Sequence, residues 1–399
     1  MTLTPYLQST VGLILLIVGG DLLVRGASRL ARLLGVSPLV VGLTVVAFGT
    51  SAPEAAVSVK ASVVGNPGLA LGNVVGSNIF NLLFILGLTA LVAPIPVHRQ
   101  LIRLDLPVLM AASILVCLLS LNGILGLAEG LVLLAALAAY VLYLARRGRA
   151  TPEGTPAGSD ALTPPATSDP GGQEPPRAPA EDLPLPPPPS RSASILRPVL
   201  HLGLALLGLA TLVVGASQLV DGSVAIARRF GASELVIGLT LVAAGTSLPE
   251  VATSLVAALR GEREIAVGNV VGSNIFNLLF VLGAAGVVAP GGIPVPRGAL
   301  TFDIPVMAGV ALACLPVFLT GRTISRWEGG LFLLYYGIYL ALLLMDAAGH
   351  DARDLLWNTV LLFVLPLTAV TALLGWWRGD LSSRRGSRPP PPSGVPSGC

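Results

Sequence analysis

The chain has 399 residues, of which 53% are hydrophobic and 11% are charged, and its mean hydropathy is +0.82. Soluble domains carry about 25% charged residues, so the composition excludes an ordinary soluble protein and indicates a polytopic membrane protein. The net charge of +3 decides little, because the placement of Lys and Arg carries the information in membrane proteins. The three cysteines have neither metal-site spacing nor the pattern of a disulfide framework: Cys117, Cys314 and Cys399.

Hydrophobic segments near the roughly 20 residues that cross a bilayer recur along the chain. The N-terminus lacks the basic region of a cleaved signal, so we expect the first segment to be a membrane helix. The sequence predicts an all-α fold with ten spans, five in residues 1–145 and five in residues 199–346, and an eleventh near 355–377. The ten expected spans are Val11–Leu23, Leu39–Val64, Leu69–Val92, Leu104–Leu121, Ile124–Ala145, Val199–Val220, Leu235–Leu259, Ile265–Val288, Phe302–Leu319 and Glu328–Met345.

Two polar segments lie outside these spans. Residues 146–198 are rich in Pro, Ser, Thr, Gly and Ala and almost free of aromatics, which predicts a disordered linker. Residues 378–399, basic and proline-rich, are expected to be a disordered tail. An N-terminus outside the cell leaves five of the 24 basic residues outside, the split that the positive-inside rule favours. We therefore expect the linker and the C-terminus to lie in the cytoplasm, beneath the cell membrane.

An internal repeat relates the two halves at an offset of 196 residues (268 − 72 = 196). The sequence GNVVGSNIFNLLF occupies Gly72–Phe84 and returns unchanged at Gly268–Phe280, and well over half of the surrounding positions match without a gap. Each half has five expected spans, an odd number, so the second half must enter the membrane from the opposite side. Inverted repeats with broken helices in matching positions indicate a binding site near the bilayer midplane.

Each half carries one carboxylate inside a hydrophobic run, Glu54 or Glu250. An ionisable residue at such a position is expensive in lipid and predicts a functional site. Helical spacing places two hydroxyls and an alanine on the same face as each glutamate. These companions are Ala47, Thr50 and Ser51 in the first half and Ala243, Thr246 and Ser247 in the second.

Pro53 and Pro249 precede the two glutamates by one residue. A proline has no N–H for the carbonyl four residues earlier, so we expect the carbonyls of Gly49 and Gly245 to be freed. Unpaired backbone at membrane depth needs another partner, and a dehydrated cation would serve.

The following span of each half presents a second polar face, and its glycines suit close helix approach. Its members are Asn73, Ser77 and Asn81 with Gly72 and Gly76, then Asn269, Ser273 and Asn277 with Gly268 and Gly272. A site of carboxylate, carbonyl, hydroxyl and amide oxygens, without His or Cys, selects hard cations such as Ca²⁺ or Na⁺. Glycine and serine often serve only in packing, and Ser and Thr often bond to their own helix. The recurrence of the whole set at one offset argues for a site.

The other ionisable residues near span ends have different expected roles. For Asp105, Asp303, Glu129 and Glu328 we expect interfacial or packing roles, and we assign no role to His98, His201 or His350.

The paired segments GLTVVAFGTSAPE and GLTLVAAGTSLPE, with the two GNVVGSN segments, resemble the α-repeats of the cation/Ca²⁺ exchanger superfamily, in particular its prokaryotic sodium/calcium exchangers. The resemblance implies ten helices in two inverted five-helix repeats, with four central helices around the ions. It implies that Glu54 and Glu250 ligate Ca²⁺ with the carbonyls of Thr50 and Thr246. The implied sodium ligands are Ala47, Ser51 and Ser77 in one half and Ala243, Ser247 and Ser273 in the other.

The resemblance also places Asn81 at the central crossing of the helices. Asn277 departs from the aspartate of archaeal and potassium-dependent relatives, which argues against potassium co-transport. The implied motion is a sliding of the first and sixth helices, and the sequence itself offers only glycines suited to close packing. These glycines are Gly12, Gly19, Gly20, Gly203, Gly208 and Gly215.

The expected function is exchange of Na⁺ for Ca²⁺ across the cell membrane by alternating access. A Ca²⁺/H⁺ exchanger is the alternative, because a buried glutamate also binds a proton. A cation channel is more remote, because channels usually have oligomeric symmetry around a continuous pore. We expect no enzymatic activity, no resident cofactor and no nucleic-acid partner. The expected partners are the bilayer and the two transported cations, and the oligomeric state is left open.

Overall fold

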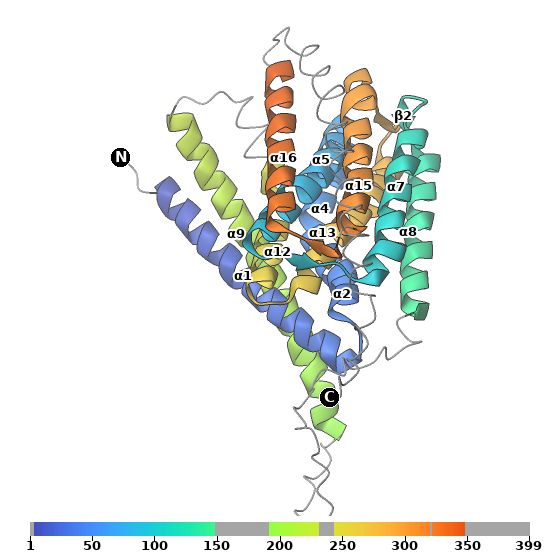
Figure 1. Ribbon diagram of the computed structural model, residues 1–399. Coiled ribbons are helices and arrows are strands. Elements are labelled where there is room, and N and C mark those ends of the chain that lie inside the picture. The colour runs from blue at the N-terminus through green and yellow to red at the C-terminus, as the bar shows by residue number, and fades with distance from the viewer. Residues whose placement is uncertain (1–3, 148–190, 231–242, 320, 348–399) are drawn as a thin grey trace, which may run out of the picture.

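The computed structural model describes residues 4–147, 191–230, 243–319 and 321–347, and these residues form a bundle of long helices (Figure 1). Short π-helical turns, labelled η, interrupt several of them. The elements of the first half are α1 (Thr4–Leu34), α2 (Pro38–Val41), η1 (Gly42–Val46), α3 (Ala47–Thr50), α4 (Ala52–Val63), α5 (Pro67–Ile79), η2 (Phe80–Ile85), α6 (Leu86–Val92), β1 (Ile95–Pro96), η3 (Leu101–Asp105), α7 (Leu106–Leu119), β2 (Ile124–Leu125) and α8 (Leu127–Arg147).

The described elements of the second half follow the same order. They are α9 (Arg191–Arg229), α11 (Ala243–Gly245), α12 (Leu248–Leu259), α13 (Arg263–Phe276), η5 (Asn277–Val281), α14 (Leu282–Val288), β3 (Ile293–Pro294), η6 (Ala299–Asp303), α15 (Ile304–Leu319), β4 (Thr323–Ile324) and α16 (Arg326–Ala347). Helices α8 and α9 extend into the segment 146–198 that the sequence predicts as a linker. The rest of that segment, the expected eleventh span and the tail lie outside the described residues.

Eight described helices are long and apolar enough to cross a membrane, and the bent pair Pro38–Thr50 and Ala52–Val63 makes up to nine. The all-α polytopic fold is therefore confirmed. Residues 231–242 are not described, so only Ala243–Leu259 of the expected span Leu235–Leu259 can be followed. The count of ten or eleven spans stays a prediction.

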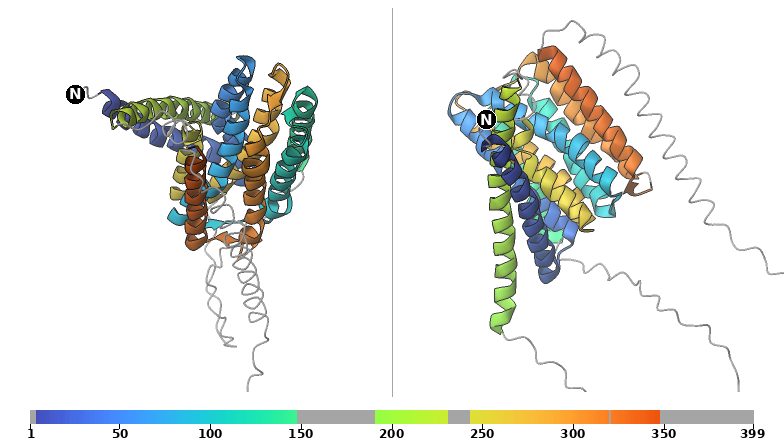
Figure 2. Two further views of the ribbon diagram at one scale, coloured as in Figure 1. Left: turned by 90° about the horizontal axis from the view of Figure 1, so that it is seen from above. Right: turned by 90° about the vertical axis from the view of Figure 1, so that its left-hand side faces the viewer.

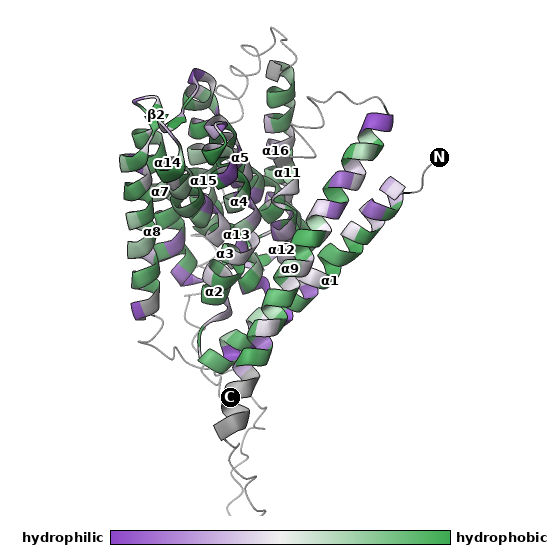
Figure 3. Cartoon of the chain, turned by 180° about the vertical axis from the view of Figure 1, so that it is seen from behind, coloured by the Kyte–Doolittle hydropathy of each residue, from purple (hydrophilic) through white to green (hydrophobic). Residues whose placement is uncertain are grey.

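Burial separates the central helices from the outer ones. In the spans Pro67–Val92 and Arg263–Val288 about four-fifths of the residues are buried (78% and 83%), against 28–39% in the other six. Lipid-facing helices can expose apolar side chains, and α7 and α8 are coloured mostly as hydrophobic in Figure 3. The two repeated GNVVGSN segments therefore occupy the centre of the bundle.

Two short antiparallel strand pairs link loops of opposite halves. Ile95 of β1 pairs with Ile324 of β4, and Ile124 of β2 pairs with Pro294 of β3. The first pair joins the loop after the third expected span to the loop after the ninth, and the second joins the loops after the fourth and eighth. Odd-numbered loops thus meet odd ones and even meet even, as loops on the same side of a membrane must.

Helices α1 and α9 form an antiparallel pair that lies beside the rest of the bundle (Figure 2). We call this pair the arm. A Cβ placed on Gly12 would lie 2.7 Å from the carbonyl oxygen of Gly215, and one on Gly19 would lie 2.8 Å from that of Gly208. Glycine is required here because the backbones touch.

Seven-residue spacing continues this contact beyond the glycines expected from the sequence. Gly26 and Gly222 also face the partner helix, with Cβ-to-carbonyl distances of 2.7 Å to His201 and 2.6 Å to Pro5. Gly20 instead faces Ala252 of α12 at 3.2 Å. The expectation was wrong for Gly203, which approaches none of the described residues, because it lies on the exposed face of α9.

Candidate ion-binding site

Two matched breaks position the buried glutamates. The helix ends at Thr50, Ser51 has φ −82° and ψ 5°, and α4 starts again at Ala52 after a 43° bend. Ser247 repeats this geometry with φ −88° and ψ 5°. Each glutamate therefore lies in the first turn of a new helix, where the helix dipole favours negative charge. Both Glu54 and Glu250 are fully buried.

The repeats exchange hydrogen bonds across the centre. Ser247 Oγ donates to Glu54 Oε1 at 3.0 Å, and Ser51 Oγ donates to Glu250 Oε1 at 3.2 Å. Each serine therefore holds the carboxylate of the other repeat. Among the described residues, the second oxygen, Oε2, has no partner on either glutamate. A buried acceptor without a partner is costly, so both oxygens have the capacity to bind a cation or a proton.

Hydroxyls of the central helices surround these carboxylates. Ser77 Oγ lies 3.1 Å from Ser247 Oγ, and Thr50 Oγ1 lies 3.3 Å from Ser273 Oγ. These four hydroxyl residues and Ser51 are buried, whereas Thr246 is half-buried. The structure thus brings together the expected residues from both repeats in one oxygen-rich cluster.

Asn73 and Asn269 brace the cluster. The Asn73 side chain donates to Ser58 Oγ at 3.0 Å and accepts from Thr246 Oγ1 at 3.2 Å. The same contacts hold Asn269 to Ser254 and to Thr50, both at 3.0 Å. Sequence reasoning missed the two serines. The available signal was their repetition at the 196-residue offset, four residues after each glutamate.

A central group of amides comes from η2, α13 and η5. Asn81 Nδ2 donates to Asn274 Oδ1 at 3.3 Å, and Asn274 is a residue that sequence reasoning left out. Asn277 is fully buried, and neither of its side-chain polar atoms has a partner in the described part of the chain. Unpaired buried amides have free donor and acceptor capacity.

The expected site includes the backbone carbonyls of two alanines, Ala47 and Ala243. The Ala47 carbonyl accepts from Ser51 N at 3.0 Å and from Thr50 Oγ1 at 3.3 Å, so it is already hydrogen-bonded. Ala243 is the first residue of α11, and its side chain is not among those that the structure describes. Gly268 and Gly272 approach Leu39 and Leu43 closely, as expected. The close approach expected for Gly72 and Gly76 stays a prediction, because the matching residues 231–242 are not described.

The remaining acidic residues lie outside this cluster. Tyr140 donates to Asp105 at 3.0 Å and Tyr339 donates to Asp303 at 3.2 Å. Glu129 accepts from Gly126 N at 2.9 Å and Glu328 from Ser325 N at 2.7 Å. These contacts fit the expected packing roles. His98, to which the sequence assigned no role, pairs with Glu264 at 3.0 Å.

Fold and site together define a membrane transporter with two inverted repeats around a buried oxygen cluster. The sequence profile described as sodium/calcium exchanger protein matches residues 5–146 and 200–345. The chain belongs to this sodium/calcium exchanger family.

Individual relatives are consistent with this family. The chain is 33% identical to the sodium/calcium exchanger MaX1 of Methanosarcina acetivorans, over 86% of this chain and 99% of that protein. It is 36% identical to the inner membrane protein YrbG of Escherichia coli (strain K12), over 76% and 86%. Its fold is similar to the solved sodium-calcium exchanger NCX_Mj, with a TM-score of 0.68 and 32% identity over 86% of this chain and all of that one.

Proposed function

We propose that this protein exchanges Na⁺ for Ca²⁺ and that Glu54 and Glu250 hold the ions. One observation carries the proposal: two buried carboxylates, each bound to the other repeat through one oxygen, keep the second oxygen unpartnered among the described residues. Two negative charges neutralise one Ca²⁺ or two Na⁺. A site of this charge alternates between the two loads and resists crossing the bilayer empty.

The serines and threonines of the cluster would complete the coordination. Ser51 and Ser77 would serve one sodium site with the Ala47 carbonyl, and Ser247 and Ser273 would serve the other with the carbonyl of Ala243. The carbonyls of Thr50 and Thr246 would join the glutamates on Ca²⁺. All of these are oxygen donors, which Ca²⁺ and Na⁺ prefer. Asn81 and Asn277 would offer their unpaired amide oxygens at the centre.

The arm is the element that we expect to move. Helix α9 contacts both breaks, because Gly49 faces Leu209 and Gly245 faces Val220. A shift of the arm along the bundle would change access to the glutamates just beyond these glycines. We place the N-terminus outside and the ends of α1 and α8 on the cytoplasmic side of the cell membrane, following the basic residues.

Proton coupling is the second candidate, because an unpartnered buried carboxylate oxygen binds a proton as readily as a metal ion. The deciding experiment reconstitutes the protein in liposomes and measures Ca²⁺ uptake. Uptake is first driven by a Na⁺ gradient, then by a pH gradient with Na⁺ absent. We expect uptake only with Na⁺. Equal uptake in both conditions would reject sodium coupling, and uptake with neither gradient would reject exchange.

A further inference from the structure

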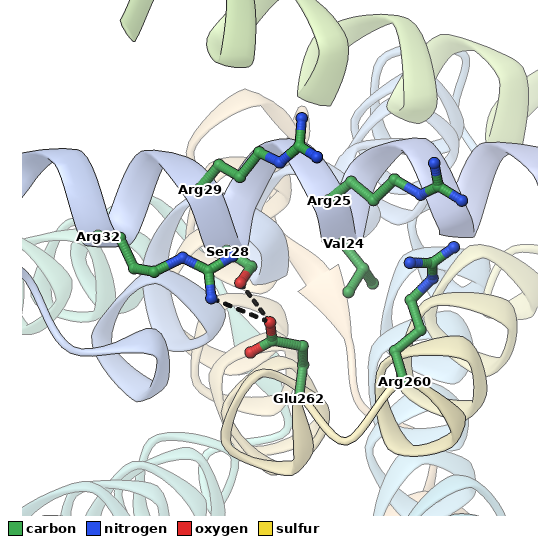
Figure 4. Close-up of a pocket in the computed structure, with 7 residues that line it drawn as sticks. All are labelled: Val24, Arg25, Ser28, Arg29, Arg32, Arg260 and Glu262. Atoms are coloured by element: carbon green, nitrogen blue, oxygen red, sulfur yellow. Dashed lines mark hydrogen bonds and ion pairs between the residues drawn. The ribbon is translucent and has the colours of Figure 1, made fainter.

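A pocket of about 240 Å³ opens where the end of α1 meets the turn between α12 and α13 (Figure 4). It shares no residue with the candidate ion site. Four arginines line it, together with a serine and a glutamate: Arg25, Arg29, Arg32, Arg260, Ser28 and Glu262. The pocket therefore concentrates guanidinium groups, which bind phosphate through paired hydrogen bonds.

The pocket has more positive than negative charge. Asp21 pairs with both Arg25 and Arg260, at 2.9 Å to the former. Glu262 lies 3.7 Å from Arg32 and accepts a hydrogen bond from Ser28. Arg29, which is exposed, pairs with no carboxylate in the described part of the chain. Two carboxylates thus accompany four guanidinium groups, which leaves two positive charges uncompensated.

The arginine pocket, unlike the candidate ion site, is not duplicated by the internal repeat. At the 196-residue offset, Asp221 and Ala225 stand in place of Arg25 and Arg29, and Val64 stands in place of Arg260. Every candidate ion ligand is duplicated, whereas of the four arginines only Arg32 has a matching arginine, Arg228. The arginine pocket therefore has no matching copy at the corresponding place of the repeat, so its ligand is expected at one membrane face only.

Apolar surface borders the pocket. Leu259, next to Arg260, is 66% exposed, and Leu33 and Leu34 at the end of α1 are 45% and 59% exposed. Exposed leucines beside arginines are typical of the boundary between acyl chains and headgroups. A ligand that combines a phosphate with an apolar chain fits this arrangement better than a free anion does.

We propose that this pocket binds the phosphate of an anionic phospholipid headgroup. The unpaired guanidinium of Arg29 and the half-compensated pair Arg25 and Arg260 would hold the phosphate oxygens. The acyl chains would lie along the exposed leucines. The lipid would thereby bridge α1 of the arm and the turn between α12 and α13.

The test uses the full-length protein in an uncharged detergent and follows its thermal unfolding. Short-chain phosphatidylglycerol is titrated in parallel with phosphatidylcholine of the same chain length and with inorganic phosphate. We expect a saturable rise in unfolding temperature with phosphatidylglycerol alone. Arg29→Gln should raise the half-saturating lipid concentration about tenfold, the effect of one charge-assisted hydrogen bond, and Arg29→Lys should raise it less.

Arg103→Gln is the matched control, because Arg103 is exposed on the same predicted membrane face and lies outside the pocket. It should leave the half-saturating concentration unchanged. Equal stabilisation by phosphatidylcholine, or equal loss in Arg103→Gln and Arg29→Gln, would overturn the proposal. Saturation by inorganic phosphate as strong as by the lipid would identify a free-anion site instead and would also overturn it. The wild-type titrations remain decisive even if a variant fails to fold.

Discussion

The two repeats are alike around the buried glutamates and different in the packing that surrounds them. Phe48 lies 5.6 Å from the rings of Phe276 and Phe280, whereas Ala244 occupies the matching position of the second repeat. The matching rings Phe80 and Phe84 instead pack against Tyr336 of α16, at 5.3 and 5.4 Å. The comparison indicates that duplication is retained where a contact serves both repeats at once, and that the periphery is free to differ.

The largest expected effect is at the glutamates. Glu54→Gln and Glu250→Gln should each reduce Na⁺-driven Ca²⁺ uptake at least ~100-fold, because each removes one of two charges that a buried cation requires. The reconstituted uptake assay measures this, with Glu129→Gln, outside the cluster, as the control. A loss in one variant tenfold smaller than in the other would show that the ligand set is not symmetric.

The next effect concerns the glycines of the arm. Gly12→Leu and its counterpart Gly208→Leu should each destabilise the protein by about 1–3 kcal/mol, because the side chain would meet the backbone of the partner helix. Thermal unfolding in detergent checks both variants. Gly203→Leu, on the face of α9 away from α1, is the control and should have a much smaller effect. Equal losses at all three positions would contradict the close contact.

A smaller effect is expected at Ser58 and Ser254, the two serines that accept hydrogen bonds from Asn73 and Asn269. Ser58→Ala and Ser254→Ala should each cost about 1 kcal/mol in unfolding free energy, because each removes a buried hydrogen bond to an asparagine. Ser62→Ala is a suitable comparison, since Ser62 Oγ is buried and has no partner among the described residues. If Ser62→Ala costs as much as the other two, the hydrogen bonds are not the reason.

The smallest effect tests a contact present in only one repeat. The hydrogen bond to Glu264 raises the pKa of His98, and the position matching Glu264 is Gly68. A raised pKa in the folded state stabilises at pH values below the unfolded pKa, and this stabilisation is lost as pH rises through the folded value. The unfolding temperature should therefore fall between pH 6 and pH 8.

His98→Gln should remove that pH dependence. The effect should be below about 1 kcal/mol, because the His98 and Glu264 side chains are 47% and 31% exposed and water screens their attraction. Identical pH profiles for the wild type and His98→Gln would show that another group causes any pH dependence.

Repetition made much of the site predictable. The glutamates, their hydroxyl companions and the GNVVGSN segments recur at one offset, and helical spacing alone places each set on one face. Spacing says nothing about which atoms of one half meet those of the other. Only the packed bundle pairs Ser51 with Glu250 and Ser247 with Glu54, because that contact joins residues 199 and 193 positions apart.

Spacing along one helix also cannot predict contacts between helices, which is why the sequence did not identify some residues. Gly26 and Gly222 acquire a role only because α1 and α9 lie antiparallel with their backbones in contact, and Gly203 lacks one because it faces away. The charge placement predicts the basic membrane face, but the pocket requires two stretches far apart in the sequence, residues 24–32 and 260–262, to meet there. The sequence by itself determined an all-helical membrane protein with a duplicated carboxylate site, since composition and periodicity are local properties. The tertiary structure decided which carboxylate oxygens stay unpaired, because burial and hydrogen bonding depend on neighbours from the other repeat.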